Sequence, residues 1–262
     1  MGEPHRIFRT PLLHALQVRY PWAGGYLVAP LAFQVARSQK WAVLSRVAKP
    51  LILMRAEPLS GVTLWIHGQL TSAAFTLHFV RRLAEVLFLQ DYTGSFSRDS
   101  RFELLYYALW GILAGSSVAH RSLVPSKTYW SAGLTLFLAG QAGNAWCHLE
   151  LRRLRAAKDA LGQSRNSTEG RAATGYYEIP SRGPFAYITC PHYTFELLTW
   201  IGYAVHSGFD PSSCVLIALS VLAMAPFAVE RHAKYALMYR KRVDGTVSLD
   251  PARKWKMVPG IW

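Results

Sequence analysis

The sequence predicts an all-α integral membrane protein, a bundle of six or seven transmembrane helices. Of its 262 residues, 51% are hydrophobic and only 17% are charged, against about 25% in soluble domains. Six apolar runs approach the roughly 20 residues that cross a bilayer as a helix, and no alternating strand pattern accompanies them. These runs cover residues 20–36, 58–80, 103–119, 130–149, 185–207 and 213–229.

The N-terminal part, residues 1–57, is predicted to hold an anchor span and an interfacial segment. The run 20–36 is interpreted as a retained anchor, because what precedes it lacks the compact apolar core and small-residue cleavage site of a signal peptide. Residues 41–54 are apolar but interrupted by two basic residues and a proline. They form either an interfacial amphipathic helix or a seventh span. Residues 58–262 complete a single membrane domain.

The net charge of +14 is concentrated in two segments. Residues 152–182 contain seven Lys and Arg, and residues 231–256 contain eight. Two predicted spans separate these segments, so both lie on one side of the membrane, and the excess of positive charge marks that side as cytosolic. Topology and attraction to anionic lipid account for this cationic rim, so nucleic acid is not an expected partner.

A polar stripe follows the predicted helix that begins at residue 58. Lipid would penalise such a stripe, whereas the interior of a bundle would accept it. His78 is equally compatible with an interhelical hydrogen bond and with a ligand contact. The stripe consists of His67, Thr71, His78, Arg82 and Glu85.

A second polar line follows the predicted helix 130–155. Its members lie at offsets of 3, 7, 11 and 14 from the first and so share one face. They pass from neutral donors and acceptors to two guanidiniums, a gradient that matches a dinucleotide with its phosphates at one end. Snorkelling arginines with buried amides are the structural alternative. The line consists of Gln141, Asn144, His148, Arg152 and Arg155.

A basic loop runs into an apolar segment at Pro191, and the site is expected to be organised around this point. Residues 156–175 are expected to be a mobile cytosolic loop and a candidate lid. Pro191 suits the first helical position, because its missing N–H is one that a helix start leaves unpaired. A helix continuing to residue 206 would rise about 24 Å. His192, Tyr193 and Glu196 would lie on or beside one face of it.

The last apolar run, 213–229, is expected to pack against the bundle. A C-terminal interfacial helix is expected to follow it, where Arg231, Tyr235, Tyr239 and Arg242 recur at helical spacing.

The cysteines lack metal-ligand spacing and the histidines are dispersed, so no metal site is expected. No GxGxxG motif follows a strand and no GxSxG elbow is present, which excludes a Rossmann site and argues against an acyl hydrolase.

Four stretches taken together resemble one known family. They are IPSRGPFAYITCPHYTFELLTWIGYAV, HFVRR, GNAWCHLELRRLR and KMVPGIW, within residues 77–262. The chain is similar to the steroid 5-alpha-reductase family, and its CPHYTFE form resembles the very-long-chain trans-2-enoyl-CoA reductase branch. The resemblance implies an NADPH-dependent enzyme of the endoplasmic reticulum membrane that reduces the 2,3 double bond of a long-chain enoyl-CoA in fatty acid elongation. Acyl-CoA, membrane lipid and elongase-complex proteins are the implied partners. A steroid or polyprenol double-bond reductase and a reductase-like scaffold are the alternatives.

The resemblance, with the chemistry of the reaction, also suggests roles for single residues. Tyr193 is the candidate proton donor, because it is neutral at rest and donates one directed hydrogen bond. His192 or Glu196 would orient it, and anchoring at the interface is its alternative role. Arg81, the fourth candidate catalytic residue, stands where the enoyl-CoA branch has Lys, and Phe79 stands where the steroid branch has a catalytic Tyr. Cofactor contacts are implied for Arg82, Asn144, His148, Arg152, Arg155, Tyr177, His192, Tyr235 and Lys254.

Overall fold

The computed structural model describes residues 26–39, 56–57, 61–89, 99–119, 124–166, 179–241 and 254–260. It is helical apart from two paired strands of two residues each, β1 (Ala56–Glu57) and β2 (Val124–Pro125). The chain divides into two compact units, Met1–Val124 and Pro125–Trp262. The predicted boundary after residue 57 stays a prediction. The segment 41–54 and Tyr177 lie outside the residues that the structure describes.

The first unit contains a helix at residues 26–38, α2 (Gly61–Phe88) and α3 (Asp99–Ala119). Its core is aromatic: the Phe33 and Phe75 rings stack with centroids 4.7 Å apart, and Phe79 follows at 4.9 Å from Phe75. A glycine lets α3 approach the helix 26–38 closely, because a Cβ on Gly111 would lie 2.8 Å from the backbone nitrogen of Phe33. Small residues permit such backbone contact between helices.

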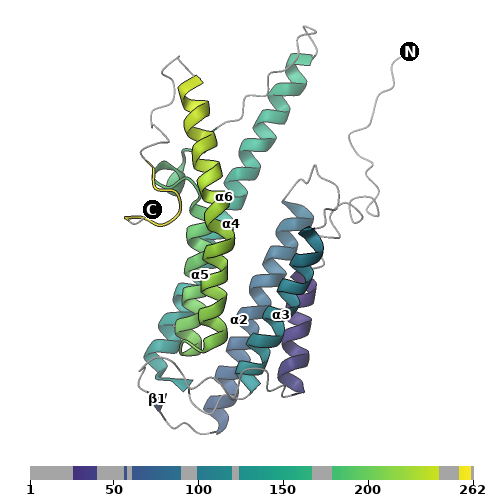
Figure 1. Cartoon of the computed structure of the whole chain (residues 1–262), viewed down its shortest axis with the longest axis vertical. Coiled ribbons are helices and arrows are strands. Elements are labelled where there is room, and N and C mark those ends of the chain that lie inside the picture. Colours follow the sequence, from purple (N-terminus) through teal and green to yellow (C-terminus); the bar gives the residue numbers. More distant parts are fainter. Residues whose placement is uncertain are drawn as a thin grey trace, which may run out of the picture. The chain divides into compact units, whose positions relative to one another are not determined.

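The second unit contains α4 (Lys127–Asn166), the short 3₁₀ helix η1 (Gly183–Ala186), α5 (Pro191–Ser207) and α6 (Pro211–Lys241). Figure 1 shows α4, α5 and α6 running side by side, with α4 continuing past the start of α5. The axes of α4 and α5 lie close together, since a Cβ on Gly133 would be 2.8 Å from the carbonyl oxygen of Gly202.

The turn from α5 to α6 is built from local capping. Gly208 adopts the left-handed conformation (φ 76°) that ends α5, and the amide of Phe209 donates to the carbonyl of Ala204 at 2.7 Å. Asp210 then accepts hydrogen bonds from the amides of Ser212 and Ser213 at 3.1 and 3.3 Å, which satisfies the first free N–H groups of α6. This turn makes α5 and α6 antiparallel neighbours.

Two predicted boundaries were wrong. Residues 156–166 are not a loop but the last turns of α4, because three of the first five residues of this stretch are alanines, which favour helix, and it contains no proline. The predicted interfacial helix is not a separate element either. It is the second half of α6, which runs without a break through Pro226. The helix within the run 185–207 was predicted correctly to begin at Pro191.

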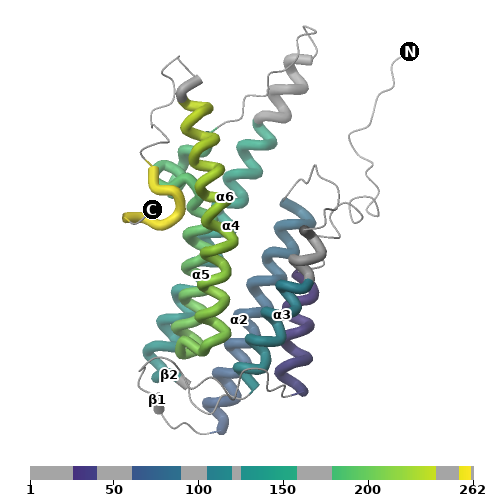
Figure 2. The backbone as a smooth tube through the Cα atoms, viewed as in Figure 1, coloured from purple at the N-terminus to yellow at the C-terminus, as the bar shows by residue number. Residues whose placement is uncertain are grey.

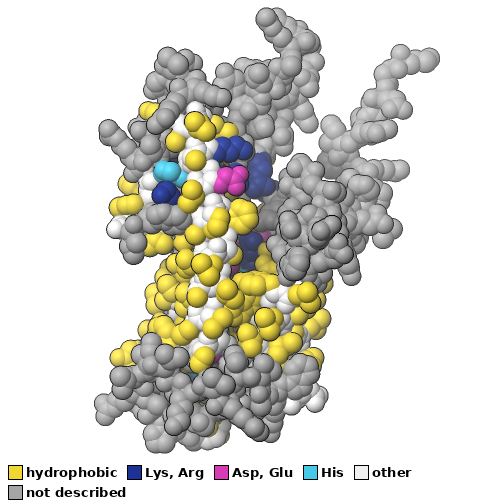
Figure 3. Space-filling view, in the orientation of Figure 1, with side chains coloured by type: hydrophobic (Ala, Val, Ile, Leu, Met, Phe, Trp, Pro, Cys, Tyr) yellow, Lys and Arg dark blue, Asp and Glu magenta, His cyan; other side chains and the backbone are white. Residues whose placement is uncertain are grey.

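The part of α6 from Pro211 to Tyr239 is long and apolar enough to cross a membrane, with a mean hydropathy of 2.2 over its most apolar 18 residues. Within the described part of the chain it is the single helix of that kind, and Leu105–Ala119 is a shorter apolar helix. Figure 3 shows apolar side chains along the visible face of α6, with charged side chains gathered toward one end. The six- or seven-span bundle therefore stays a prediction.

Candidate functional site

The first turn of α5 is the centre of the candidate site. Pro191 occupies the first helical position and Cys190 precedes it as the N-terminal cap. The His192 and Tyr193 rings lie 4.2 Å apart between centroids. Tyr193 also packs against the buried cluster of Cys190, Ala228 and Met257. This turn therefore presents an imidazole and a phenol next to the positive end of a helix.

The polar line of α4 has the graded burial that its sequence predicts. Gln141 and Asn144 are buried, His148 is half-buried and Arg152 is exposed, while Arg155 is partly exposed. The line therefore passes from buried amide groups to an exposed Arg side chain, and a dinucleotide site along it stays a prediction.

A hydrogen bond joins this line to α5. The Asn144 amide nitrogen, 2% exposed, donates to the backbone carbonyl of His192 at 2.7 Å. The His148 and His192 rings lie 5.7 Å apart between centroids. The structure thus brings together four predicted site residues from helices nearly 50 positions apart in sequence: Asn144, His148, His192 and Tyr193. Glu196 is partly buried one turn further along α5.

The loop before α5 is held against α4 by residues that the sequence analysis missed. Glu150 is buried on α4 and forms two ion pairs. Its carboxylate oxygen Oε2 lies 3.3 Å from Nη1 of Arg153 and 3.7 Å from Nη1 of Arg182. Gly183 (φ 55°) lies so close to the Trp146 ring that an added Cβ would be 2.5 Å from it. The Glu150–Arg153 spacing of three could have been found from sequence. The contact with Arg182 could not.

Two of the predicted cofactor residues lie in the interior of the second unit. Tyr235 is buried on α6. Lys254 is 8% exposed, and its ammonium group donates to the carbonyls of Pro180 and Phe185 at 3.1 and 2.7 Å. Burial lowers the pKa of Lys254 below its ordinary value. The contacts of Lys254 are thus to the chain itself, and its role toward a cofactor stays a prediction.

The first unit contains the remaining predicted residues, Arg81 and Arg82, in a buried ionic cluster. Glu85 is 2% exposed and pairs with both guanidiniums, with Arg82 Nη1 at 2.6 Å from its carboxylate. Arg82 also donates to the Tyr26 hydroxyl at 3.2 Å. His78 is buried nearby in sequence, with its ring edge-on to Phe79 at 5.0 Å. The polar stripe of α2 does face the interior, as predicted.

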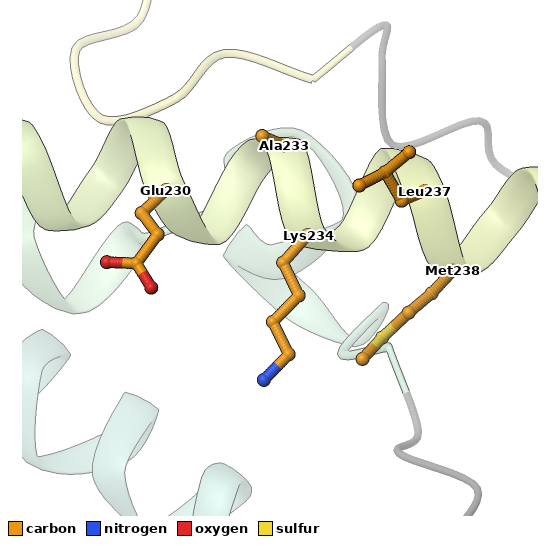
Figure 4. Close-up of a pocket in the computed structure, with 5 residues that line it drawn as sticks. All are labelled: Glu230, Ala233, Lys234, Leu237 and Met238. Carbon is orange, nitrogen blue, oxygen red and sulfur yellow. The ribbon is translucent and has the colours of Figure 1, made fainter.

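A pocket lies on α6, which supplies all the lining residues that the structure describes. It is an open pocket of about 420 Å³. Figure 4 shows Glu230, Lys234 and Met238, spaced four residues apart, projecting to the same side of the helix. None of the predicted site residues lines it. Its described lining residues are Glu230, Ala233, Lys234, Leu237 and Met238.

A known protein family matches the part of the chain that contains the candidate site. Residues 101–246, more than half of the sequence, match the family model described as 3-oxo-5-alpha-steroid 4-dehydrogenase. The match includes all of α4, α5 and α6 and therefore Asn144, His148, His192 and Tyr193.

Curated relatives carry two kinds of name. A very-long-chain enoyl-CoA reductase of Dictyostelium discoideum is 28% identical over 169 residues, 62% of this chain and 49% of that protein. A polyprenal reductase of Xenopus laevis is 30% identical over 171 residues, 61% of this chain and 50% of that protein. A probable very-long-chain enoyl-CoA reductase of Caenorhabditis elegans is 27% identical over 178 residues, 64% and 53%. The chain spans about half the length of the curated relatives it matches. It belongs to the 3-oxo-5-alpha-steroid 4-dehydrogenase family, as the resemblance noted in its sequence predicted.

Proposed function

We propose that this chain is a reductase that saturates a carbon–carbon double bond conjugated to a carbonyl, with NADPH as its cofactor. The observation that carries the proposal is the hydrogen bond from Asn144 to His192. It sets the graded face of α4 against the positive end of α5, so amide, imidazole and guanidinium groups follow one another from the interior to solvent. This donor set fits a dinucleotide, whose nicotinamide end is neutral and whose phosphates select Arg.

The substrate we favour is a long-chain or very-long-chain trans-2-enoyl-CoA in fatty acid elongation, at the endoplasmic reticulum membrane and with elongase-complex proteins as partners. Relatives named very-long-chain enoyl-CoA reductase support it. A polyprenal is the second candidate substrate, because relatives with that name are similarly close, at 25–30% identity. The apolar length of α6 supports membrane association, which would suit the lipid character of both substrates.

The reaction needs a hydride at the β carbon and a proton at the α carbon, and the bound cofactor would supply the hydride. Tyr193 would donate a hydrogen bond to the substrate carbonyl, stabilise the enolate as it forms and deliver the proton. The dipole of α5 favours the same negative charge. His192, whose ring is 4.2 Å from that of Tyr193, would orient the phenol. Arg81 is paired with Glu85, and a catalytic role for it stays a prediction.

The test is NADPH oxidation by the purified full-length chain in detergent with three substrates: a trans-2-enoyl-CoA, a polyprenal and a 4-ene-3-one steroid. Turnover of the enoyl-CoA alone supports the favoured substrate, and turnover of the polyprenal alone supports the second candidate. Nucleotide binding without turnover of any of them would favour a scaffold that has kept the fold. Absence of nucleotide binding would refute the dinucleotide site.

Two variants with matched controls test the residues. Tyr193→Phe should lower turnover at least about 100-fold, within the range for loss of a positioned proton donor, and leave nucleotide binding intact. Tyr187→Phe is its control, since Tyr187 is exposed just before α5. Arg152→Ala should weaken nucleotide binding roughly tenfold, as loss of a charge-assisted hydrogen bond does. Arg153→Ala, one residue along and paired with Glu150, should not. Full turnover by Tyr193→Phe would show that the proton donor is another group.

A further inference from the structure

The segment 254–260 is bound along the loop that leads into α5. Ile188 and Trp255 form a parallel β-bridge, and three backbone hydrogen bonds surround it. The amide of Thr189 donates to Trp255 at 2.7 Å, the amide of Cys190 donates to Lys256 at 3.1 Å, and the amide of Trp255 donates to Tyr187 at 3.0 Å. Figure 2 shows this segment, in yellow, folded against the chain just before α5. The loop is thus paired through an isolated bridge with a segment about 65 residues further along the chain.

Lys254 fastens the start of this segment. Its ammonium group donates to Pro180 and Phe185, two buried residues at either end of the loop's first turn. These carbonyls lie outside any sheet or long helix and need a donor, because a buried carbonyl left without one is costly. A buried lysine is itself costly unless it is hydrogen-bonded. The arrangement offsets both costs, and it explains a cation in the interior without a carboxylate partner.

Side chains continue the attachment into the site. The Thr194 hydroxyl donates to the carbonyl of Met257, and the Met257 side chain packs with Cys190 beneath Tyr193. On the opposite side, the Thr189 hydroxyl lies 2.8 Å from Nδ1 of His232 on α6. The residues that flank His192 and Tyr193 are therefore fixed by contacts outside α5. Displacing the segment 254–260 would therefore free Cys190, the N-terminal cap of α5, and would remove the Met257 side chain from its contact with the cluster that includes Tyr193.

We infer that the segment 254–260 is a clasp that fixes the first turn of α5, and that Lys254 is a positioning residue for the site on that turn. The clasp acts through the Pro180 and Phe185 carbonyls and the amides of Thr189 and Cys190. Its effect on catalysis rests on the proposed function, whereas its effect on the loop does not.

The test is amide hydrogen exchange in the nucleotide-free, full-length protein. Lys254→Met keeps the approximate length of the side chain and removes its hydrogen-bond donors. Because hydrogen bonds from a charged donor are lost, local opening of the loop becomes easier. The amides of Thr189 and Cys190 should therefore exchange at least about tenfold faster. Lys254→Arg supplies donors for both carbonyls and should restore exchange to within about threefold of wild type. Lys127→Met, an exposed position at the far end of α4, is the control for the loss of charge.

Unchanged exchange in Lys254→Met would overturn the clasp. A weaker affinity for NADPH in Lys254→Met with unchanged exchange would make Lys254 a cofactor contact instead and would equally overturn it. Thr194→Val, which removes one side-chain bond to the segment, should also accelerate exchange at Cys190, and it carries the test if Lys254→Met does not fold. Exchange in Thr194→Val equal to wild type would then refute the clasp.

The catalytic arm uses the same variants. Lys254→Met should lower kcat about tenfold or more and leave the KM for nucleotide within about threefold, with rescue by Lys254→Arg. A raised KM at unchanged kcat would contradict a positioning role. If the wild-type protein turns over none of the three substrates, the proposed function fails, and the exchange arm still decides the clasp.

Discussion

Replacing Gly140 by alanine tests whether the close approach of α4 and α5 builds the site. A Cβ at this position would lie 2.6 Å from the Thr199 backbone nitrogen and 2.8 Å from the Phe195 carbonyl oxygen. Ordinary contacts are about 3.5 Å, so the helices would have to separate by on the order of 1 Å. The Asn144–His192 hydrogen bond, 2.7 Å long and one turn away, would then be outside bonding range.

The expected cost combines two terms. Overpacking costs about 1–3 kcal/mol, and loss of the buried hydrogen bond costs about 1 kcal/mol more. A total of about 2–4 kcal/mol corresponds to a melting temperature roughly 6–12 °C lower for a chain of this size. Nucleotide binding should weaken as well, because the graded face of α4 would no longer meet the start of α5.

The assay measures thermal unfolding in detergent, with circular dichroism as the signal. Gly68→Ala is the matched control, because the same Cβ would meet its nearest atoms at an ordinary 3.7 Å in the middle of α2. It should stabilise the protein by about 0.5–1 kcal/mol, since glycine is a poor helix former. If Gly140→Ala melts at the same temperature as Gly68→Ala, the inferred backbone contact between α4 and α5 does not exist.

Three further predictions follow from single buried groups. Asn144→Leu should lower the free energy of unfolding by about 1–3 kcal/mol, because it removes the donor to His192, and an unchanged melting temperature would contradict this. Glu85→Gln should cost about 3–5 kcal/mol, because two guanidiniums lose a buried partner. The exposed Glu230→Gln should stay within about 0.5 kcal/mol, and equal effects of the two substitutions would refute the buried cluster. Burial lowers the pKa of Lys254 in the folded protein, so between that pKa and the ordinary value near 10.4 the unfolded chain binds more protons. Stability should therefore rise with pH through this window, measured as the unfolding free energy of wild type minus that of Lys254→Met, and a difference independent of pH would contradict the lowered pKa.

Much of the helical framework could be predicted because its signals are local. Pro191 marks the start of α5 through its missing N–H, and the structure begins the helix there. The spacing of Asn144, His148 and Arg152 predicts one face with graded burial, and the structure shows it. The end of α4 was missed because a polar composition was taken for a loop, although the residues from 156 to 166 favour helix.

The contacts that complete the candidate site have no local signal. Lys254 reaches a carbonyl 74 positions away, and Arg182, in the loop before α5, pairs with a carboxylate on α4. A sequence shows that Lys254 is basic but not that its partners are main-chain oxygens in a buried loop. The resemblance suggested a cofactor contact for it, whereas the structure places its ammonium group against two carbonyls of the loop that leads into α5.

The sequence by itself determined that the chain is helical, the polar faces of α2 and α4, the position of the α5 start and the family. Periodicity and end-capping depend on residues within one or two turns of each other, so a linear pattern contains them. Only the tertiary structure decided which polar groups meet: Asn144 with His192, Glu85 with two arginines, and Lys254 with two carbonyls. Burial forces each of these groups to find a partner, and the packing of the helices and the bound segment 254–260 determines which one it finds.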